Sequence, residues 1–491
     1  MRKDLFSHPC CLSGLSRRSF MTATAAGAFA APLAAAPAAE ESGNLAEHVD
    51  LASFRPKPAV KIMSAVIRFK PPYWLGWPGT AYPIEDERAR YGRIFDELAR
   101  KVGVSLEPEA APLESDADVA AFAAKVKDRT PHAVFVMLQH INVWHWADAI
   151  AKAGVPAIFF APIGMAFTGH VREISRRPGV HVISSLDTGA VEQAFRMVRA
   201  KEQLAATRLL VVAGGARQET VMDRLGTKVR YVPRGRLNEL FERMPVTDEA
   251  REVARAMAKS AQGVVEPTAD DFLNSARSFT TAKRLMRDEN ANGITTDCLG
   301  MVSSRVVPTP PCMSVTLFGD AGVSYGCEAD LNAALGMLFV SYLFDKAGFM
   351  NDPVPETFKN TLIVAHCTCG TKLDGFGKES APYIARSHSE SNLGVAPQVL
   401  WRMDTPVTLV NFRGPHELIL DTGKVVGNVQ TPPAGGCRTS VELAMDRVPD
   451  CRDVLGFHQF VFYGEHRRDV EAFCQMYGIK VVNSDRQGVK A

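Results

Sequence analysis

Short apolar runs alternate with amphipathic segments through the first half of the chain. Residues 85–102 place apolar side chains on one face at helical spacing and predict an amphipathic helix. Four runs rich in β-branched and aromatic residues have the composition of buried strands: 60–68, 132–137, 155–160 and 180–184. Because strands and helices alternate in this way, we predict a doubly wound α/β sandwich with a parallel sheet at residues 56–205.

A second α/β pattern follows over residues 206–355. It opens on the apolar run 208–213, continues with further strand-like and helical segments, and includes a long apolar stretch at residues 331–349. An apolar stretch of this length predicts a buried helix. We therefore predict a second doubly wound α/β sandwich domain in this part of the chain.

The last part of the chain, residues 356–491, has a different pattern. Strand-like runs such as 407–411 and 416–421 dominate it, and turns are expected at residues 421–423 and 432–436. The predicted fold class is therefore α/β, with two doubly wound sandwich domains followed by a β-rich C-terminal domain.

Residues 1–39 have the pattern of a twin-arginine export signal. Arg17 and Arg18 are followed by an alanine-rich apolar stretch at residues 22–36. A membrane anchor is the alternative, but the stretch is short and dominated by alanine. We predict an exported protein, periplasmic or extracellular, without a membrane partner.

Charge and composition restrict the class of ligand. The chain has 491 residues, of which 56 are basic and 54 acidic, for a net charge of +2. So balanced a charge indicates neither a nucleic-acid-binding surface nor a polybasic membrane patch. Small neutral molecules are the expected partners.

The cysteines do not form the framework of a disulfide-rich fold. Ten are present; Cys10 and Cys11 lie in the predicted signal, and the other eight fall between Cys298 and Cys474. This distribution would leave the N-terminal part of the mature chain without a disulfide. Cys367 could be a thiolate metal ligand or an ordinary buried cysteine. We favour ordinary burial because no second cysteine pair has zinc spacing.

Two acidic residues bracket the apolar stretch, and two histidines follow them. Glu328 precedes the stretch and Asp352 comes shortly after it, with His366 at the end of a strand-like run and His458 near the C-terminus. Carboxylates combined with imidazoles suit Mn²⁺ or a similar divalent cation. The alternative is structural: Glu328 and Asp330 would cap a helix, and Asp352 would begin a turn with Pro353.

Several motifs resemble the L-fucose and L-arabinose isomerase superfamily. In the second domain these motifs are Pro310-Pro311-Cys312, Asp320-Ala321-Gly322-Val323 and Cys327-Glu328-Ala329-Asp330. Near the C-terminus they are Gly456-Phe457-His458-Gln459, Tyr463-Gly464-Glu465-His466 and residues 473–482. Usable motifs cover residues 285–491, and the N-terminal half agrees only in layout.

The resemblance implies a metal-dependent aldose–ketose isomerase that acts on a free sugar through an ene-diolate. Glu328, Asp352 and His458 would hold Mn²⁺, or Co²⁺ or Mg²⁺, with His366 as an additional ligand. Glu328 and Asp352 would also be the catalytic proton-transfer pair. The resemblance further implies a homo-oligomer, a trimer or hexamer. Export leaves two alternatives open: a metal-dependent glycoside hydrolase or lyase, and a sugar-binding periplasmic protein.

An aromatic loop follows the first predicted strand. Trp74 and Trp77 lie close together in it, and Arg68 ends the preceding strand. Because open α/β sheets bind ligands at the carboxyl ends of their strands, these three residues are candidates for binding a carbohydrate. Indole rings stack on sugars and also occur at subunit interfaces, so the loop is a candidate for either role.

Overall fold

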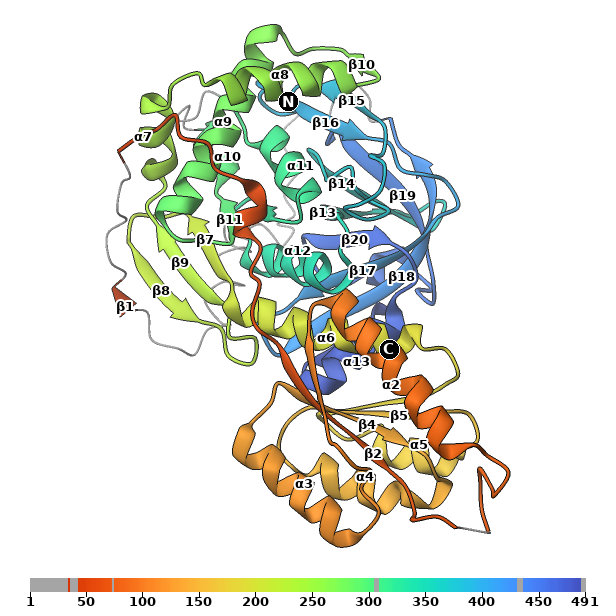
Figure 1. Ribbon diagram of the computed structural model, residues 1–491. Helices are drawn as coiled ribbons and strands as arrows, with labels where there is room; N and C mark the ends of the chain where they lie inside the picture. The colour runs from red at the N-terminus through yellow and green to blue at the C-terminus, as the bar shows by residue number, and fades with distance from the viewer. Residues whose placement is uncertain (1–33, 36–42, 73–74, 304–308, 431–435, 487–491) are drawn as a thin grey trace, which may run out of the picture.

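The computed structural model describes residues 34–35, 43–72, 75–303, 309–430 and 436–486. The predicted export signal, apart from residues 34–35, lies outside these ranges, as do Trp74 and most of the turn expected at residues 432–436. The described chain forms two α/β parts and a C-terminal antiparallel β-barrel (Figure 1). This arrangement agrees with the predicted order of two α/β domains and a β-rich domain.

The N-terminal part is built on a parallel sheet of five strands in the order β3-β2-β4-β5-β6. Its strands are β2 (Lys61–Ile67), β3 (Ser105–Pro108), β4 (Ala133–Leu138), β5 (Ala157–Ala161) and β6 (Val180–Ser184). Its helices are α2 (Ile84–Val102), α3 (Asp116–Arg129), α4 (Trp144–Ala151), α5 (Thr168–Ile174) and α6 (Gly189–Ala206), with short 3₁₀ turns at Leu51–Phe54 and Ile141–Val143.

Neighbouring residues of a strand point to opposite faces of the sheet. Apolar side chains occur on both faces here, and helices cover both. Phe135 of β4 packs in a cluster with residues of α2 and α6, whereas Val134 and Val136 pack with residues of α3 and α4. Both faces are therefore buried, which explains why the strand sequences are apolar throughout rather than alternating.

The second part contains a six-stranded sheet in the order β1-β8-β9-β7-β11-β12. The strands are β1 (Ala34–Ala35), β7 (Arg208–Val212), β8 (Gln218–Val221), β9 (Lys228–Val232), β11 (Gly293–Thr296) and β12 (Ser324–Gly326). The helices are α7 (Gly235–Arg243), α8 (Asp248–Ser260), α9 (Ala269–Asp288), α10 (Cys298–Ser303), α11 (Cys312–Asp320) and α12 (Leu331–Phe344). The sheet is parallel from β9 to β12, while β8 pairs antiparallel with β9 at one side.

The barrel is closed because β17 pairs with β18 as well as with β20. Its strands are β13 (Phe349–Glu356), β14 (Thr361–His366), β17 (Pro406–Phe412), β18 (Glu417–Asn428), β19 (Thr439–Met445) and β20 (Gln459–Tyr463), with β21 (Lys480–Val482) added beside β18. A small sheet of β10 (Gly263–Val264), β15 (Tyr383–Arg386) and β16 (Ala396–Val399) adjoins it, together with α13 (Arg467–Tyr477) and 3₁₀ turns at Cys451–Asp453 and Ser484–Arg486.

Helix α12 lies between the second sheet and the barrel (Figure 1). It has 14 residues, nearly all of them buried, and it also packs against α6 of the N-terminal part. Burial on all sides explains why its sequence is apolar around the whole helix. No helix in the described ranges has both the length and the apolar character needed to cross a bilayer.

Two turns expected from the sequence are absent from the described structure. Pro353 lies inside β13, opposite Val364 of β14. The pairing of β13 with β20 ends before Pro353, so the missing N–H of the proline breaks no hydrogen bond to β20. Residues 421–423 lie inside the long strand β18. Gly423 is needed there because a Cβ atom would lie 2.7 Å from the carbonyl oxygen of Ala444 on β19.

An ion cluster joins the N-terminal part to α12. Asp345, which ends α12 in a left-handed conformation, accepts hydrogen bonds from Arg55 at 2.9 Å and Arg199 at 3.1 Å, and also from Arg196. Burial alone would raise the pKa of Asp345, but the charges of Arg199, Arg55 and Arg196 hold it below its usual value. The carboxylate therefore stabilises the folded state when it is ionised.

We expect Asp345→Asn to lower the free energy of unfolding by about 1 to 2 kcal/mol at neutral pH. Asparagine tolerates the left-handed conformation, so the change removes mainly the charge. The expected loss is less than the roughly 3 to 5 kcal/mol of a fully buried pair because a third of the side chain is exposed. Since the folded pKa is depressed, the difference from wild type should shrink as the pH falls below about 4. Denaturant unfolding at neutral and acidic pH measures the difference in stability between Asp345→Asn and wild type. Equal stability of the two proteins at neutral pH would show that the ion cluster does not stabilise the fold.

Candidate metal site and proton-transfer site

Glu328 lies in the short connection between β12 and α12. Glu328 and the following Ala329 have φ angles of 57° and 55°, which place both in the left-handed region. Residues other than glycine rarely adopt this region and do so mostly at functional sites or tight turns. The connection leaves Glu328 buried, with its carboxylate beside two histidines.

His458 is at the centre of the buried cluster. Its Nε2 atom lies 3.2 Å from Oδ1 of Asp352 and 3.7 Å from Oε2 of Glu328. Nε2 of His366 lies 3.8 Å from Oε1 of Glu328. The four residues are at most 9% exposed, and they come from β13, the end of β14, the loop before β20 and the loop before α12. The structure thus brings together all four residues proposed from the sequence as metal ligands.

Asp330 supports this cluster and was not recognised from the sequence as a site residue. Its Oδ1 accepts a hydrogen bond from the backbone N–H of Ala333 and caps α12, at 2.9 Å. Its Oδ2 lies 2.9 Å from Nδ1 of His458. A histidine whose Nδ1 donates to a carboxylate presents Nε2 to a metal in a fixed orientation. The helix-capping interpretation was therefore right for Asp330, but it accounts for only one of its two oxygens.

The charges of the cluster depend on one another. Burial lowers the pKa of His366 to about 4, so this imidazole is neutral at physiological pH. Burial also disfavours the charged form of His458, but the carboxylates of Asp330, Asp352 and Glu328 outweigh it and raise its pKa well above the usual value. Burial would raise the pKa of Glu328, but His458 and His366 hold it below its usual value. Without a metal ion, a charged His458 therefore neutralises part of the acidic cluster.

The residues of the cluster fit a divalent cation. One ligand atom from each of Glu328, His366 and His458 lies within 4.8 Å of the other two. In the described part of the chain, Oε2 of Glu328 and Nε2 of His458 are buried without a partner in hydrogen-bonding geometry. A cation would contact both atoms and replace the ion pairs that a charged His458 makes with the carboxylates. A mixed oxygen and nitrogen donor set of this kind suits Mn²⁺, Co²⁺ or a related cation.

We expect Asp330→Asn to weaken metal binding by about 10- to 100-fold, which is the usual cost of losing a supporting contact to a histidine ligand. An asparagine side chain has a single oxygen, so it cannot both cap α12 and accept from His458. Isothermal titration of metal-free protein with Mn²⁺ measures the change. Asp248→Asn, at the exposed first residue of α8, is the matched control. Unchanged affinity in Asp330→Asn would show that Asp330 acts only as a helix cap.

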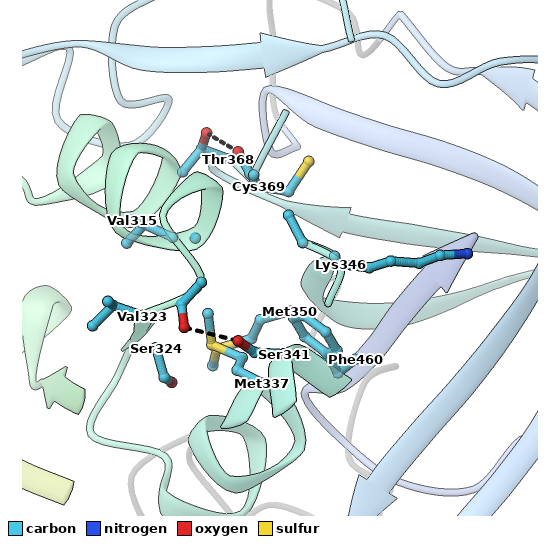
Figure 2. Close-up of a pocket in the computed structure, with 15 residues that line it drawn as sticks. Val315, Val323, Ser324, Met337, Ser341, Lys346, Met350, Thr368, Cys369 and Phe460 are labelled. Carbon is cyan, nitrogen blue, oxygen red and sulfur yellow. Dashed lines mark hydrogen bonds between the residues drawn. The ribbon is translucent and has the colours of Figure 1, made fainter. Parts of the chain in front are cut away.

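A narrow pocket lies near the cluster in sequence, but none of the four cluster residues lines it (Figure 2). It lies beside Met350 on β13 and Thr368 just after β14, each two residues from a member of the cluster, and its lining is mainly apolar. The Sδ atom of Met350 accepts a hydrogen bond from the backbone N–H of Cys327, which fixes the chain immediately before Glu328. In Figure 2 the side chain of Lys346 points away from this pocket, and its ammonium donates to the carbonyl of Tyr463. The pocket is therefore a mainly apolar space and not part of the cluster itself.

The structure does not bring the aromatic loop to this cluster within one chain. Arg68 is buried at the end of β2 and forms ion pairs with Glu85 at 2.7 Å and Glu114 at 2.8 Å. Trp77 is 53% exposed, and its ring contacts Phe167. Both residues belong to the N-terminal part, which lies at the opposite end of the molecule from α11 and β14 (Figure 1). Trp74 lies outside the described residues.

Comparison with known proteins yields no match, either to a protein-family model or to a curated protein sequence. The functional interpretation therefore depends on the geometry of the cluster.

Proposed function

We propose that this protein is a divalent-metal-dependent aldose–ketose isomerase that acts on a free sugar through an ene-diolate. The observation that carries the proposal is the convergence of Glu328, Asp352, His366 and His458 in a buried cluster. Two carboxylates beside two imidazoles provide both metal ligands and groups that move protons. The motifs around Glu328 and His458 that resemble sugar isomerases support the same reaction.

Different side chains of the cluster would bind the metal, orient a ligand and transfer the proton. Glu328, His366 and His458 would hold the cation, with Asp352 beside them, and Asp330 keeps His458 in a fixed orientation. A bound divalent cation polarises the sugar oxygens and makes the neighbouring C–H bond more acidic. Glu328 and Asp352 are the groups that remove the proton from C2 and return it to C1. Burial of the site excludes water, which strengthens the electrostatic interactions within it.

Direct conversion of free sugars tests the proposal. The purified mature protein is incubated with a panel of aldoses and Mn²⁺, and ketose formation is followed by NMR. We expect one class of aldose to be converted, with activity lost after chelation and restored by added metal. If some glycoside is cleaved while no aldose is converted, the hydrolase alternative replaces the isomerase. Sugar binding without any product would instead identify a receptor.

We also propose that the protein is a homo-oligomer, a trimer or hexamer, whose interface includes the aromatic loop. Large apolar side chains are exposed at the carboxyl ends of the N-terminal strands, where β2, β5 and β6 lead into loops: Leu75, Trp77, Ile163, Phe167 and Leu186. A cluster of exposed apolar residues of this kind marks an interaction surface. Such an interface would also allow the loop to approach the site of a neighbouring subunit.

Light scattering tests the assembly. We expect a mass corresponding to a trimer or hexamer in the wild-type protein. Trp77→Ser together with Phe167→Ser should shift the mass towards that of a monomer, because the two rings contact each other and are each more than half exposed. Phe358→Ser, at a solitary and almost fully exposed phenylalanine, is the control and should leave the mass unchanged. A wild-type mass equal to one chain would contradict the proposal.

The proposed location is the periplasm or the extracellular space, reached by the twin-arginine pathway. The support for this proposal is the pair Arg17 and Arg18 with the alanine-rich stretch that follows. Small carbohydrates outside the cytoplasm would then be the substrates.

A further inference from the structure

A second group of metal-ligand side chains lies next to the first, and the proposed isomerase does not use it. One ligand atom from each of Cys312, Cys367 and His388 lies within 4.8 Å of the other two. Cys312 begins α11, Cys367 immediately follows β14, and His388 lies in the loop after β15. Cys312 and His388 are only 4% and 3% exposed. Three separate elements thus present sulfur and nitrogen atoms to one point.

A fourth cysteine extends this group. Cys437 is a neighbour of Cys367, and the nearby thiol together with burial raises the pKa of Cys437, although Cys437 is not among the three residues whose ligand atoms lie within 4.8 Å of one another. Cys437 lies just before β19, and the described cysteines, this one included, form no disulfide. Three cysteines and one histidine make one of the ligand sets that bind structural zinc tetrahedrally.

Hydrogen bonds fix the elements that carry these side chains. Arg438, next to Cys437, donates to the carbonyl of Ser387, next to His388, at 2.8 Å. Thr316 of α11 is hydrogen-bonded to Thr368, the neighbour of Cys367, at 2.7 Å. One bond thus links the segment of Cys437 to that of His388, and the other links the helix that carries Cys312 to the segment of Cys367, which helps to preorganise the group.

His388 is itself held by a neighbouring side chain. Its Nδ1 lies 2.9 Å from the hydroxyl oxygen of Ser391. Nδ1 also accepts a hydrogen bond from the backbone N–H of Ser391 at 3.2 Å, so two contacts to Ser391 hold the ring. A fixed ring orientation of this kind is typical of histidine ligands.

We propose that Cys312, Cys367, Cys437 and His388 form a structural zinc site, separate from the cluster around Glu328. The two sites differ in ligand chemistry: thiolates select Zn²⁺, whereas carboxylates with imidazoles accept Mn²⁺. His366 is the last residue of β14 and Cys367 is the next residue, and each belongs to one of the two groups of candidate ligands. Zinc would therefore join α11, the end of β14 and the β15 loop, and would hold His366 in place.

Cysteine spacing alone did not reveal this site. Cys367 and Cys369 are two residues apart, but Cys369 packs in an apolar cluster of the barrel and takes no part. The partners of Cys367 are instead distant in sequence. The thiols of Cys367 and Cys437 also have raised pKa values, because each is buried against another thiol. Zinc binding must then displace protons from them.

Cobalt titration of the full-length, fully reduced protein tests the proposal. Chelator-treated protein is titrated with Co²⁺, which reports thiolate ligation by a sulfur-to-cobalt charge-transfer band in the near ultraviolet. Because the cluster around Glu328 also accepts Co²⁺, we expect the band to be complete by two equivalents of Co²⁺ and to be abolished by added Zn²⁺. Cys367→Ser should eliminate the band, whereas Cys451→Ser, at a cysteine outside the group, should retain it.

The readout is independent of the isomerase reaction. Glu328→Gln should keep the thiolate band even though it disables the neighbouring site, so failure of one proposal is distinguishable from failure of the other. The wild-type titration tests the zinc-site proposal without any variant, because absence of a thiolate band overturns it. A band that persists in Cys367→Ser, or a native disulfide between Cys312 and Cys367 found by mass spectrometry, also overturns it.

Discussion

Glu328→Gln is expected to abolish both metal retention and isomerase activity while leaving the fold intact. Glutamine has the same shape, but it lacks the charge that faces His458 and His366. Loss of a supporting contact alone weakens metal binding by about 10- to 100-fold, so loss of a ligand should cost more than about 100-fold. Activity should fall by at least a further factor of about 100, because Glu328 is also one of the two proposed proton-transfer groups.

Two measurements together examine this variant. Elemental analysis gives the metal content after dialysis, and circular dichroism establishes that the protein is folded. Glu379→Gln makes the same chemical change at an exposed position and should retain wild-type metal and activity. A folded Glu328→Gln protein with the metal content of the wild type would remove the basis of the proposed site.

Asp352→Asn should separate proton transfer from metal binding. Its carboxylate lies 3.2 Å from His458, but Glu328, His366 and His458 form a compact ligand set without it. We therefore expect weaker but measurable metal binding. Isomerisation should fall by about 100- to 10,000-fold, the usual contribution of a positioned acid or base.

The assay compares the turnover of Asp352→Asn and wild type at saturating Mn²⁺, which compensates for any loss of affinity. Asp374→Asn, at a side chain nearly half exposed and paired with Arg402, is the control. Full turnover by Asp352→Asn at saturating metal would assign the proton transfer to another residue.

Much of the fold was predictable because it depends on local patterns. The strand at residues 60–68 and the helix at residues 85–102 are found as β2 and α2 within one residue at each end. Closure of the barrel was not predictable, since it depends on pairing between strands far apart in the chain. Residues 421–423 illustrate the difficulty: they have the composition of a turn, but Gly423 instead permits a close approach to β19.

The candidate site was predictable to the extent that residue type indicates ligand chemistry. Glu328, Asp352, His366 and His458 were selected in this way, and they lie together in the structure. The second oxygen of Asp330 could not have been assigned, because its partner His458 is distant in sequence and becomes adjacent only on folding.

Proton exchange with solvent distinguishes an ene-diolate mechanism from hydride transfer and from cleavage. The wild-type protein is incubated with its aldose and Mn²⁺ in D₂O, and deuterium at C2 of the recovered aldose is measured by NMR. We expect incorporation of deuterium at C2 that requires the metal and is lost in Asp352→Asn. Two results would contradict proton transfer by Glu328 and Asp352. One is conversion of the sugar without deuterium at C2 and with hydrogen transferred directly between the carbons. The other is cleavage of the sugar with C2 unlabelled.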